Sequence, residues 1–153
     1  MPTNYSFTTI WRFSAPIDQV WDAIWSVDRW PSWWSSLESV RLIQPGTGPD
    51  ELGAVRRFSW KTRLGYRLVF DLKLVQVERF HRIQSQAFGD LQGTGIWNFT
   101  RQDQETVVRY DWTVSTTKRW MNWLAPVARP LFAWNHDQVM QDGERGLRQL
   151  THA

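Results

Sequence analysis

The sequence of 153 residues contains no cysteine, and this absence excludes several kinds of chemistry at once. Without cysteine there is no disulfide framework, no thiolate nucleophile and no thiolate metal site. Histidine is scarce as well: the three histidines, His81, His136 and His152, are scattered along the chain. Metal sites need ligand residues grouped at suitable spacing. We therefore expect no bound metal and no other cofactor.

Long apolar runs are missing too. No stretch approaches the roughly 18 apolar residues of a membrane span, and the first residues, MPTNYSFTTIW, lack the basic flank and apolar run of a secretory signal. No repeat, low-complexity tract or linker divides the chain, and its length suits one domain over residues 1–153. We expect a cytoplasmic protein without integral membrane association, acting as a monomer or a homodimer.

The charges give no sign of a nucleic-acid partner. The 18 basic and 15 acidic residues leave a net charge of +3, and the basic residues never form a run of five or more. A nucleic-acid groove needs a concentrated basic surface. The nearest approach is the group of bases between Arg56 and Arg67, which the solvated outer face of a hairpin explains better. We expect no nucleic-acid binding.

Tryptophan is what the sequence has in excess: 12 residues, beside 8 phenylalanines and 3 tyrosines. Each large aromatic side chain can bury about 150–250 Å², and an aliphatic core of this size normally devotes far less area to rings. Rigid rings that leave gaps between them suit the wall of a ligand cavity. The alternative is that the rings simply fill a large core, and for any single tryptophan both explanations stay open.

The pattern of apolar residues predicts the order of the elements. Alternation over 5–13 predicts a half-buried strand, and Pro16 then begins a helix whose buried stripe includes Val20, Trp21 and Ile24. A second short helix is predicted over 31–37, with Pro31 near its start. Six more strands are predicted over 38–43, 53–61, 66–77, 80–88, 91–100 and 106–115. Strands and helices segregated in this way indicate an α+β fold with an antiparallel sheet.

The last long segment, from Pro130 to Leu150, is predicted to be one amphipathic helix lying across that sheet. Residues 116–128 are predicted to form a short helical turn or a kinked segment before it. Gly143 and Gly146 each cost about 1 kcal/mol relative to alanine in helix propensity; close packing against the strands, or space for a cavity, would explain them. The apolar stripe of the helix runs through Phe132, His136, Val139 or Met140, Gly143, Leu147 and Leu150.

Five local strings occur in a characteristic order: Ser14 to Trp21, Asp28 to Trp34, Gly95 to Phe99, Thr106 to Tyr110, and Trp134 to Leu147. Together they resemble the START/Bet v 1-like (SRPBCC) superfamily, and within it the polyketide cyclase/dehydrase-like group. The resemblance implies the helix-grip fold, in which a curved seven-stranded antiparallel sheet wraps around a long C-terminal helix and two short helices follow strand 1. It also implies a deep apolar cavity that binds lipids, sterols, polyketides or other hydrophobic molecules. It implies no single reaction, because some members cyclise or dehydrate polyketides and others only carry ligands.

Inward-facing residues of the expected elements form the predicted wall of a ligand site. We expect this site to bind a hydrophobic, aromatic or polycyclic small molecule. The predicted ligand-binding residues are Trp25, Trp34, Phe58, Trp60, Tyr66, Leu68, Phe70, Trp97, Phe99, Tyr110, Trp112, Phe132, His136 and Met140.

His136 is the candidate catalytic residue, and whether the protein is an enzyme stays open. With an ordinary pKa near 6.5, it could act as acid or base toward an enolisable ketone, with Tyr66 or Tyr110 donating to the enolate. The alternative is that His136, or its neighbour Asn135, bonds to backbone of the loops at the cavity mouth. No second histidine or acid shares the face of His136. A polyketide cyclase or dehydratase is therefore the alternative function.

Overall fold

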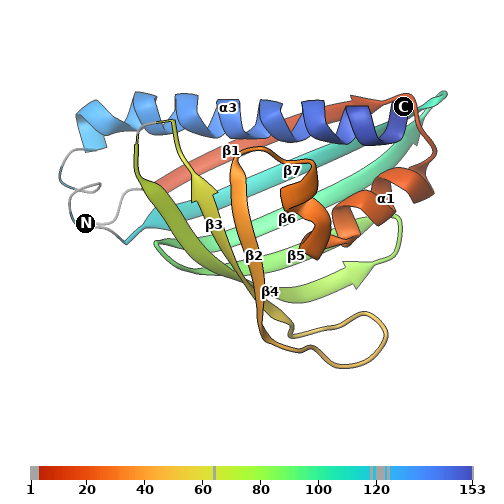
Figure 1. Ribbon diagram of the computed structural model, residues 1–153, viewed down its shortest axis with the longest axis horizontal. Helices are drawn as coiled ribbons and strands as arrows, with labels where there is room; N and C mark the ends of the chain where they lie inside the picture. Colours follow the sequence, from red (N-terminus) through yellow and green to blue (C-terminus); the bar gives the residue numbers. More distant parts are fainter. Residues whose placement is uncertain (1–3, 64, 118, 120–122, 124, 153) are drawn as a thin grey trace.

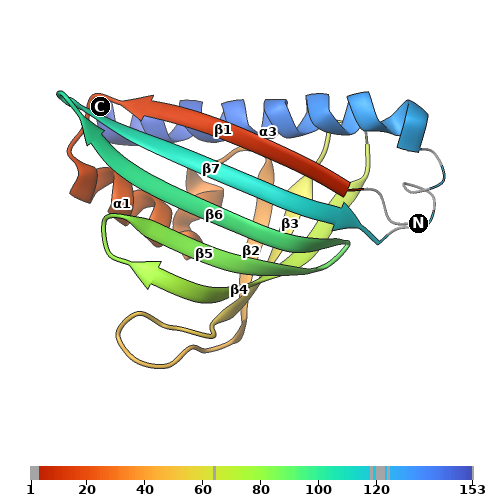
Figure 2. The same ribbon diagram turned by 180° about the vertical axis from the view of Figure 1, so that it is seen from behind.

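Seven strands form one curved sheet, and a long helix lies across it (Figures 1 and 2). The computed structural model describes residues 4–63, 65–117, 119, 123 and 125–152. The strands are β1 (Asn4–Phe13), β2 (Leu37–Gln44), β3 (Val55–Lys61), β4 (Arg67–Glu78), β5 (Arg82–Gly89), β6 (Leu91–Gln102) and β7 (Glu105–Thr116). The helices are α1 (Ile17–Trp25), the 3-10 helix η1 (Val27–Ser32) and α3 (Ala125–His152).

The order of the strands in the sheet is β1-β7-β6-β5-β4-β3-β2, and every neighbouring pair is antiparallel. The first strand therefore pairs with the last, so that Tyr5 lies opposite Val114 and Trp11 opposite Val108. The predicted α+β helix-grip fold is confirmed: α3 crosses the sheet, and α1 and η1 follow β1. Among the described residues, no helix is both long enough and apolar enough to cross a membrane.

The inner face of the sheet brings aromatic side chains together in register. Phe58 pairs with Phe70 across β3 and β4, and Trp97 pairs with Tyr110 across β6 and β7. Directly opposed side chains on one face of a sheet are in contact. A register shift next to Leu74 interrupts the β4–β5 pairing, and such irregularities bend a sheet. The curved sheet therefore turns these rings towards α3.

The second short helix differs from the prediction. It is a 3-10 helix over Val27–Ser32 with Pro31 inside it, not a helix over 31–37. The chain leaves the helix early because Trp34 turns inward, where its indole N–H donates to the carbonyl oxygen of Val139 on α3 (2.8 Å). Leu37, which was predicted to end this helix, instead begins β2.

The long helix begins earlier than predicted, at Ala125, and ends at His152. Pro126 and Pro130 both lie within it, and both are exposed. Of the predicted segment 116–128, residues 118, 120–122 and 124 lie outside the described residues. The buried stripe ends at Leu147: Leu150 is 55% exposed, because it borders an open surface hollow between α1, η1 and α3.

Close packing accounts for the two glycines of α3. A Cβ on Gly143 would lie 2.5 Å from a ring carbon of Trp34 and 2.9 Å from one of Trp11. A Cβ on Gly146 would overlap the backbone carbonyl of Trp33. Neither glycine lines the cavity described below. Of the two explanations the sequence left open, close packing is therefore correct: the partners are Trp11 of β1 together with Trp33 and Trp34, which follow η1.

Candidate functional site

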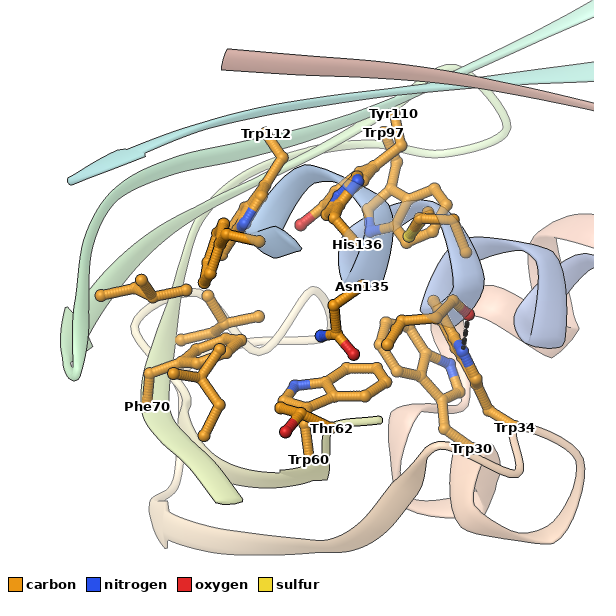
Figure 3. Close-up of a pocket in the computed structure, with 16 residues that line it drawn as sticks. Trp30, Trp34, Trp60, Thr62, Phe70, Trp97, Tyr110, Trp112, Asn135 and His136 are labelled. Carbon is orange, nitrogen blue, oxygen red and sulfur yellow. Dashed lines mark hydrogen bonds between the residues drawn. The ribbon is translucent and has the colours of Figure 1, made fainter. Parts of the chain in front are cut away.

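A cavity lies between the inner face of the sheet and the first half of α3 (Figure 3). Its volume is about 80 Å³, which is room for several water molecules, since one needs about 10–15 Å³. No lysine, arginine, aspartate or glutamate is among its lining residues. These residues are Trp30, Trp34, Trp60, Thr62, Leu68, Phe70, Leu72, Leu91, Trp97, Tyr110, Trp112, Phe132, Asn135, His136, Val139 and Met140.

The rings of the cavity wall hold one another in place. The ring centroids of Trp97 and Tyr110 are 4.1 Å apart, and those of Phe70 and Trp112 are 5.4 Å apart. Trp34 meets Trp60 edge to face at 5.0 Å. Aromatic pairs at these separations add roughly 0.5–1.5 kcal/mol each beyond the area they bury. The wall is therefore a network of mutually packed rings.

His136 reaches the cavity from α3, and its imidazole stacks on Phe7 of β1 with the centroids 4.1 Å apart. Its side chain is only 11% exposed, and neither ring nitrogen has a hydrogen-bond partner. Burial lowers the pKa of His136 to about 4. The Asp137 carboxylate lies 4.0 Å from Nδ1, but it is 68% exposed, so water screens its attraction and burial dominates. His136 is therefore neutral at pH 7.

The side chain of Asn135 ties α3 to the connection between β3 and β4. Its Oδ1 accepts a hydrogen bond from the backbone N–H of Arg63 (2.9 Å). This is the arrangement that the sequence offered as the alternative to catalysis, with Asn135 rather than His136 bonded to loop backbone. Within the same connection, the Thr62 hydroxyl donates to the carbonyl oxygen of Tyr66 (2.6 Å). Asn135 therefore has a structural role at the edge of the cavity.

A buried carboxylate strengthens the same attachment. Asp142 of α3 accepts a hydrogen bond from the Ser36 hydroxyl (2.5 Å) and pairs with the guanidinium groups of Arg63 (3.2 Å) and Arg145 (3.3 Å). The Asp142 side chain is 6% exposed, whereas the two arginines are about half exposed or more. A buried carboxylate needs such partners to offset its desolvation. Arg63 is thus held to α3 through both its backbone and its side chain.

The two tyrosines proposed as catalytic partners lie in different places. Tyr110 lines the cavity, and its hydroxyl lies 2.5 Å from where a Cβ on Gly95 would be, so that glycine makes room for it. Burial raises the pKa of Tyr110, and the phenol stays protonated. Tyr66 is half-buried and does not line the cavity. Burial raises the pKa of Tyr66, and the nearby Tyr5 adds to the effect.

Most of the predicted ligand-binding residues surround this one cavity, but four lie elsewhere. Trp25 and Phe58 line a second, smaller cavity of about 50 Å³ beneath α1. Phe99 packs against Trp21 instead, with the centroids 4.9 Å apart, and Tyr66 directly precedes β4. The ten predicted residues that line the cavity are Trp34, Trp60, Leu68, Phe70, Trp97, Tyr110, Trp112, Phe132, His136 and Met140.

The prediction missed six lining residues. Leu72 shares the inward phase of Phe70, so strand periodicity could have identified it. Val139 stands on the inner helical face and was considered only as an alternative to Met140. Trp30 was not among the predicted site residues; the 3-10 helix that carries it was predicted to begin only at Pro31. The six are Trp30, Thr62, Leu72, Leu91, Asn135 and Val139.

Within the part of the chain that the structure describes, no three histidines, aspartates or glutamates gather as metal ligands would.

Comparisons with known proteins agree with this fold. No curated protein sequence matches the chain. The fold is similar to the di-domain aromatase/cyclase BexL of the BE-7585A biosynthetic pathway (TM-score 0.76, 20% identity), covering 98% of this chain and 50% of BexL. The chain thus spans half the length of that relative.

Two further solved structures share the fold over nearly their whole length. One is the ZhuI aromatase/cyclase from Streptomyces sp. R1128 (TM-score 0.76, 13% identity, 98% of this chain and 94% of that one). The other is a START superfamily protein from Mycobacterium smegmatis (TM-score 0.76, 10% identity, 96% and 97%). A family model described as polyketide cyclase / dehydrase and lipid transport matches residues 6–150. Because this match spans almost the entire chain, the protein belongs to that family.

Proposed function

We propose that this protein binds a small hydrophobic, aromatic molecule in the cavity between the sheet and α3. The observation that carries the proposal is the cavity wall: eight of its sixteen residues are tryptophan, phenylalanine or tyrosine, and none is charged at pH 7. Apolar walls with a few polar groups are typical of small-molecule sites. The family description, which includes both cyclases and lipid transport, supports the same class of ligand.

The size of the cavity limits the ligand. At about 80 Å³, it is far below the roughly 300–1,000 Å³ of sites for drug-sized molecules. An engineered cavity of about 150 Å³ already binds benzene. The cavity described above has about half that volume, so we propose a ligand of no more than one aromatic ring, whose entry needs small shifts of the wall side chains. A polycyclic ligand requires side chains of the wall to move.

Toluene and naphthalene test this proposal. We expect toluene to raise the thermal unfolding midpoint of the protein, since a ligand at 100 times its Kd stabilises the folded state by about 2.7 kcal/mol. Val139→Phe places a ring in the cavity and should abolish the effect. Leu131→Phe, on the exposed face of the same helix, should leave it unchanged. Differential scanning calorimetry and isothermal titration give the two readouts. The proposal is contradicted if toluene does not bind the wild-type protein, or if it binds the Val139→Phe variant equally well. Binding of naphthalene shows that side chains of the cavity wall move apart.

A cyclase or dehydratase activity is the second candidate. His136 and Tyr110 line the same cavity, and both nitrogens of His136 are free to contact a substrate. A pKa of about 4 makes His136 a weak base at neutral pH, which is why binding is the first proposal. The proposed activity predicts that a poly-β-ketone substrate loses one water on cyclisation, detectable by mass spectrometry. His136→Asn should stop this loss while toluene still binds; an unchanged rate in that variant excludes His136 as the acid or base.

A further inference from the structure

Three buried polar atoms at the cavity lack a hydrogen-bond partner. They are Nε1 of Trp60 and both ring nitrogens of His136. Two other tryptophans that line the cavity do have hydrogen-bond acceptors. Nε1 of Trp30 donates to the carbonyl oxygen of Ile24 (3.0 Å), and Nε1 of Trp34 donates to the carbonyl oxygen of Val139. A buried polar group without a partner costs about 1–3 kcal/mol. Within the described residues only five buried side-chain atoms are unpaired, and three of them border this cavity.

The two side chains belong to different walls. Trp60 is on β3, and His136 is on α3 (Figure 3). Trp60 is 9% exposed and the His136 side chain 11%, so bulk water does not compensate either group. An indole N–H can only donate, whereas a neutral imidazole offers one donor and one acceptor. A bound molecule that satisfies both must accept from Trp60 and exchange a hydrogen bond with His136.

Resting on the binding function proposed above, we infer that Trp60 and His136 select a neutral ligand whose aromatic ring carries a hydroxyl or carbonyl oxygen. A hydroxyl fits both groups, because it accepts and donates. A carboxylate does not fit, because it would be buried without a cation: no lysine or arginine is among the described residues that line the cavity, and the nearby Arg63 is paired with Asp142. A purely apolar ring leaves the three polar atoms unpaired.

Phenol, toluene and benzoate separate these possibilities, because phenol and toluene differ only by hydroxyl against methyl. We expect wild-type protein to bind both and to reject benzoate in isothermal titration. Trp60→Phe keeps a ring but removes the N–H, so the preference for phenol over toluene should fall roughly fivefold, the value of one hydrogen bond. His136→Phe should reduce it similarly. Phe70→Leu removes a ring of the wall without a polar atom and should weaken both ligands alike.

The wild-type protein supplies an independent readout. The indole N–H proton signal of Trp60 should shift when phenol is added and remain nearly unchanged with toluene, which keeps the test valid should Trp60→Phe not fold. If neither phenol nor toluene binds wild-type protein, the binding function itself is wrong. If toluene binds but the phenol preference is the same in all variants, or if benzoate binds most tightly, the binding function stands and the selection by Trp60 and His136 is wrong.

Discussion

The protein should lose stability as the pH falls from 6.5 to 4, and His136 should account for roughly 3 kcal/mol of that loss. In the unfolded chain this histidine has its ordinary pKa of 6.5, while burial lowers the pKa in the folded protein to about 4. Below pH 6.5 the unfolded state therefore binds a proton that the folded state does not. Each pH unit between the two values costs about 1.4 kcal/mol. Above pH 6.5 the contribution is constant, because both states are neutral.

Urea unfolding at a series of pH values measures this effect. His136→Phe should remove the His136 contribution from the pH dependence, and it should be at least as stable as wild type at pH 7, because it eliminates two unpaired buried nitrogens. His81, which is exposed on the turn between β4 and β5, supplies the matched control, and His81→Gln should keep the wild-type profile. A His136→Phe profile identical to that of wild type contradicts the burial of a neutral imidazole.

Gly146→Ala should destabilise the protein by about 3 kcal/mol, although alanine is the better helix former by about 1 kcal/mol. The added methyl group would overlap the backbone carbonyl of Trp33. A backbone atom cannot rotate away as a side chain can, so either α3 or the segment after η1 must shift. Either shift disturbs Trp34, whose ring packs on Gly143 and whose N–H donates to Val139.

Thermal and urea unfolding give the readout for Gly146→Ala. Gln149→Ala, an exposed substitution one turn further along α3, should change stability by no more than about 0.5 kcal/mol. An increase in stability for Gly146→Ala, as helix propensity alone predicts, contradicts the close approach of Trp33 to the helix.

The strands were predictable because each carries its own signal. In β4, Leu68, Phe70 and Leu72 alternate with residues that include the charged Asp71 and Lys73, and this pattern indicates which face is buried, whatever the strand packs against. The short helix after α1 was not predictable to the same degree. Its bounds depend on where Trp30 and Trp34 find acceptors, on α1 and on α3 respectively. Such partners are distant in the sequence, and a local pattern does not contain them.

In the candidate site, too, some features follow from local sequence pattern and others depend on distant neighbours. Nine of the ten predicted wall residues came from the inward phase of a strand or helix, and Trp34 came from its place in the second short helix. Phase could not tell that Phe99 packs beneath α1 while Trp97, two residues earlier on the same face, borders the cavity. It also could not show that the N–H of Trp60 is unpaired, since this depends on every neighbour at once. The sequence identified His136 as a residue of the site; its neutrality follows only from burial in three dimensions.

The pairing of β1 with β7 has a consequence for how the chain folds. Its register joins Tyr5 to Val114, so the first strand has no partner in the sheet until almost the whole sheet sequence is available. Contacts of such long sequence separation slow folding, and proteins dominated by them fold on the scale of milliseconds to seconds. During synthesis β1 leaves the ribosome with an unpaired edge, which can pair with other chains. The pairing of β1 with β7 is therefore expected to be a late step in folding. Until this pairing forms, aggregation competes with folding.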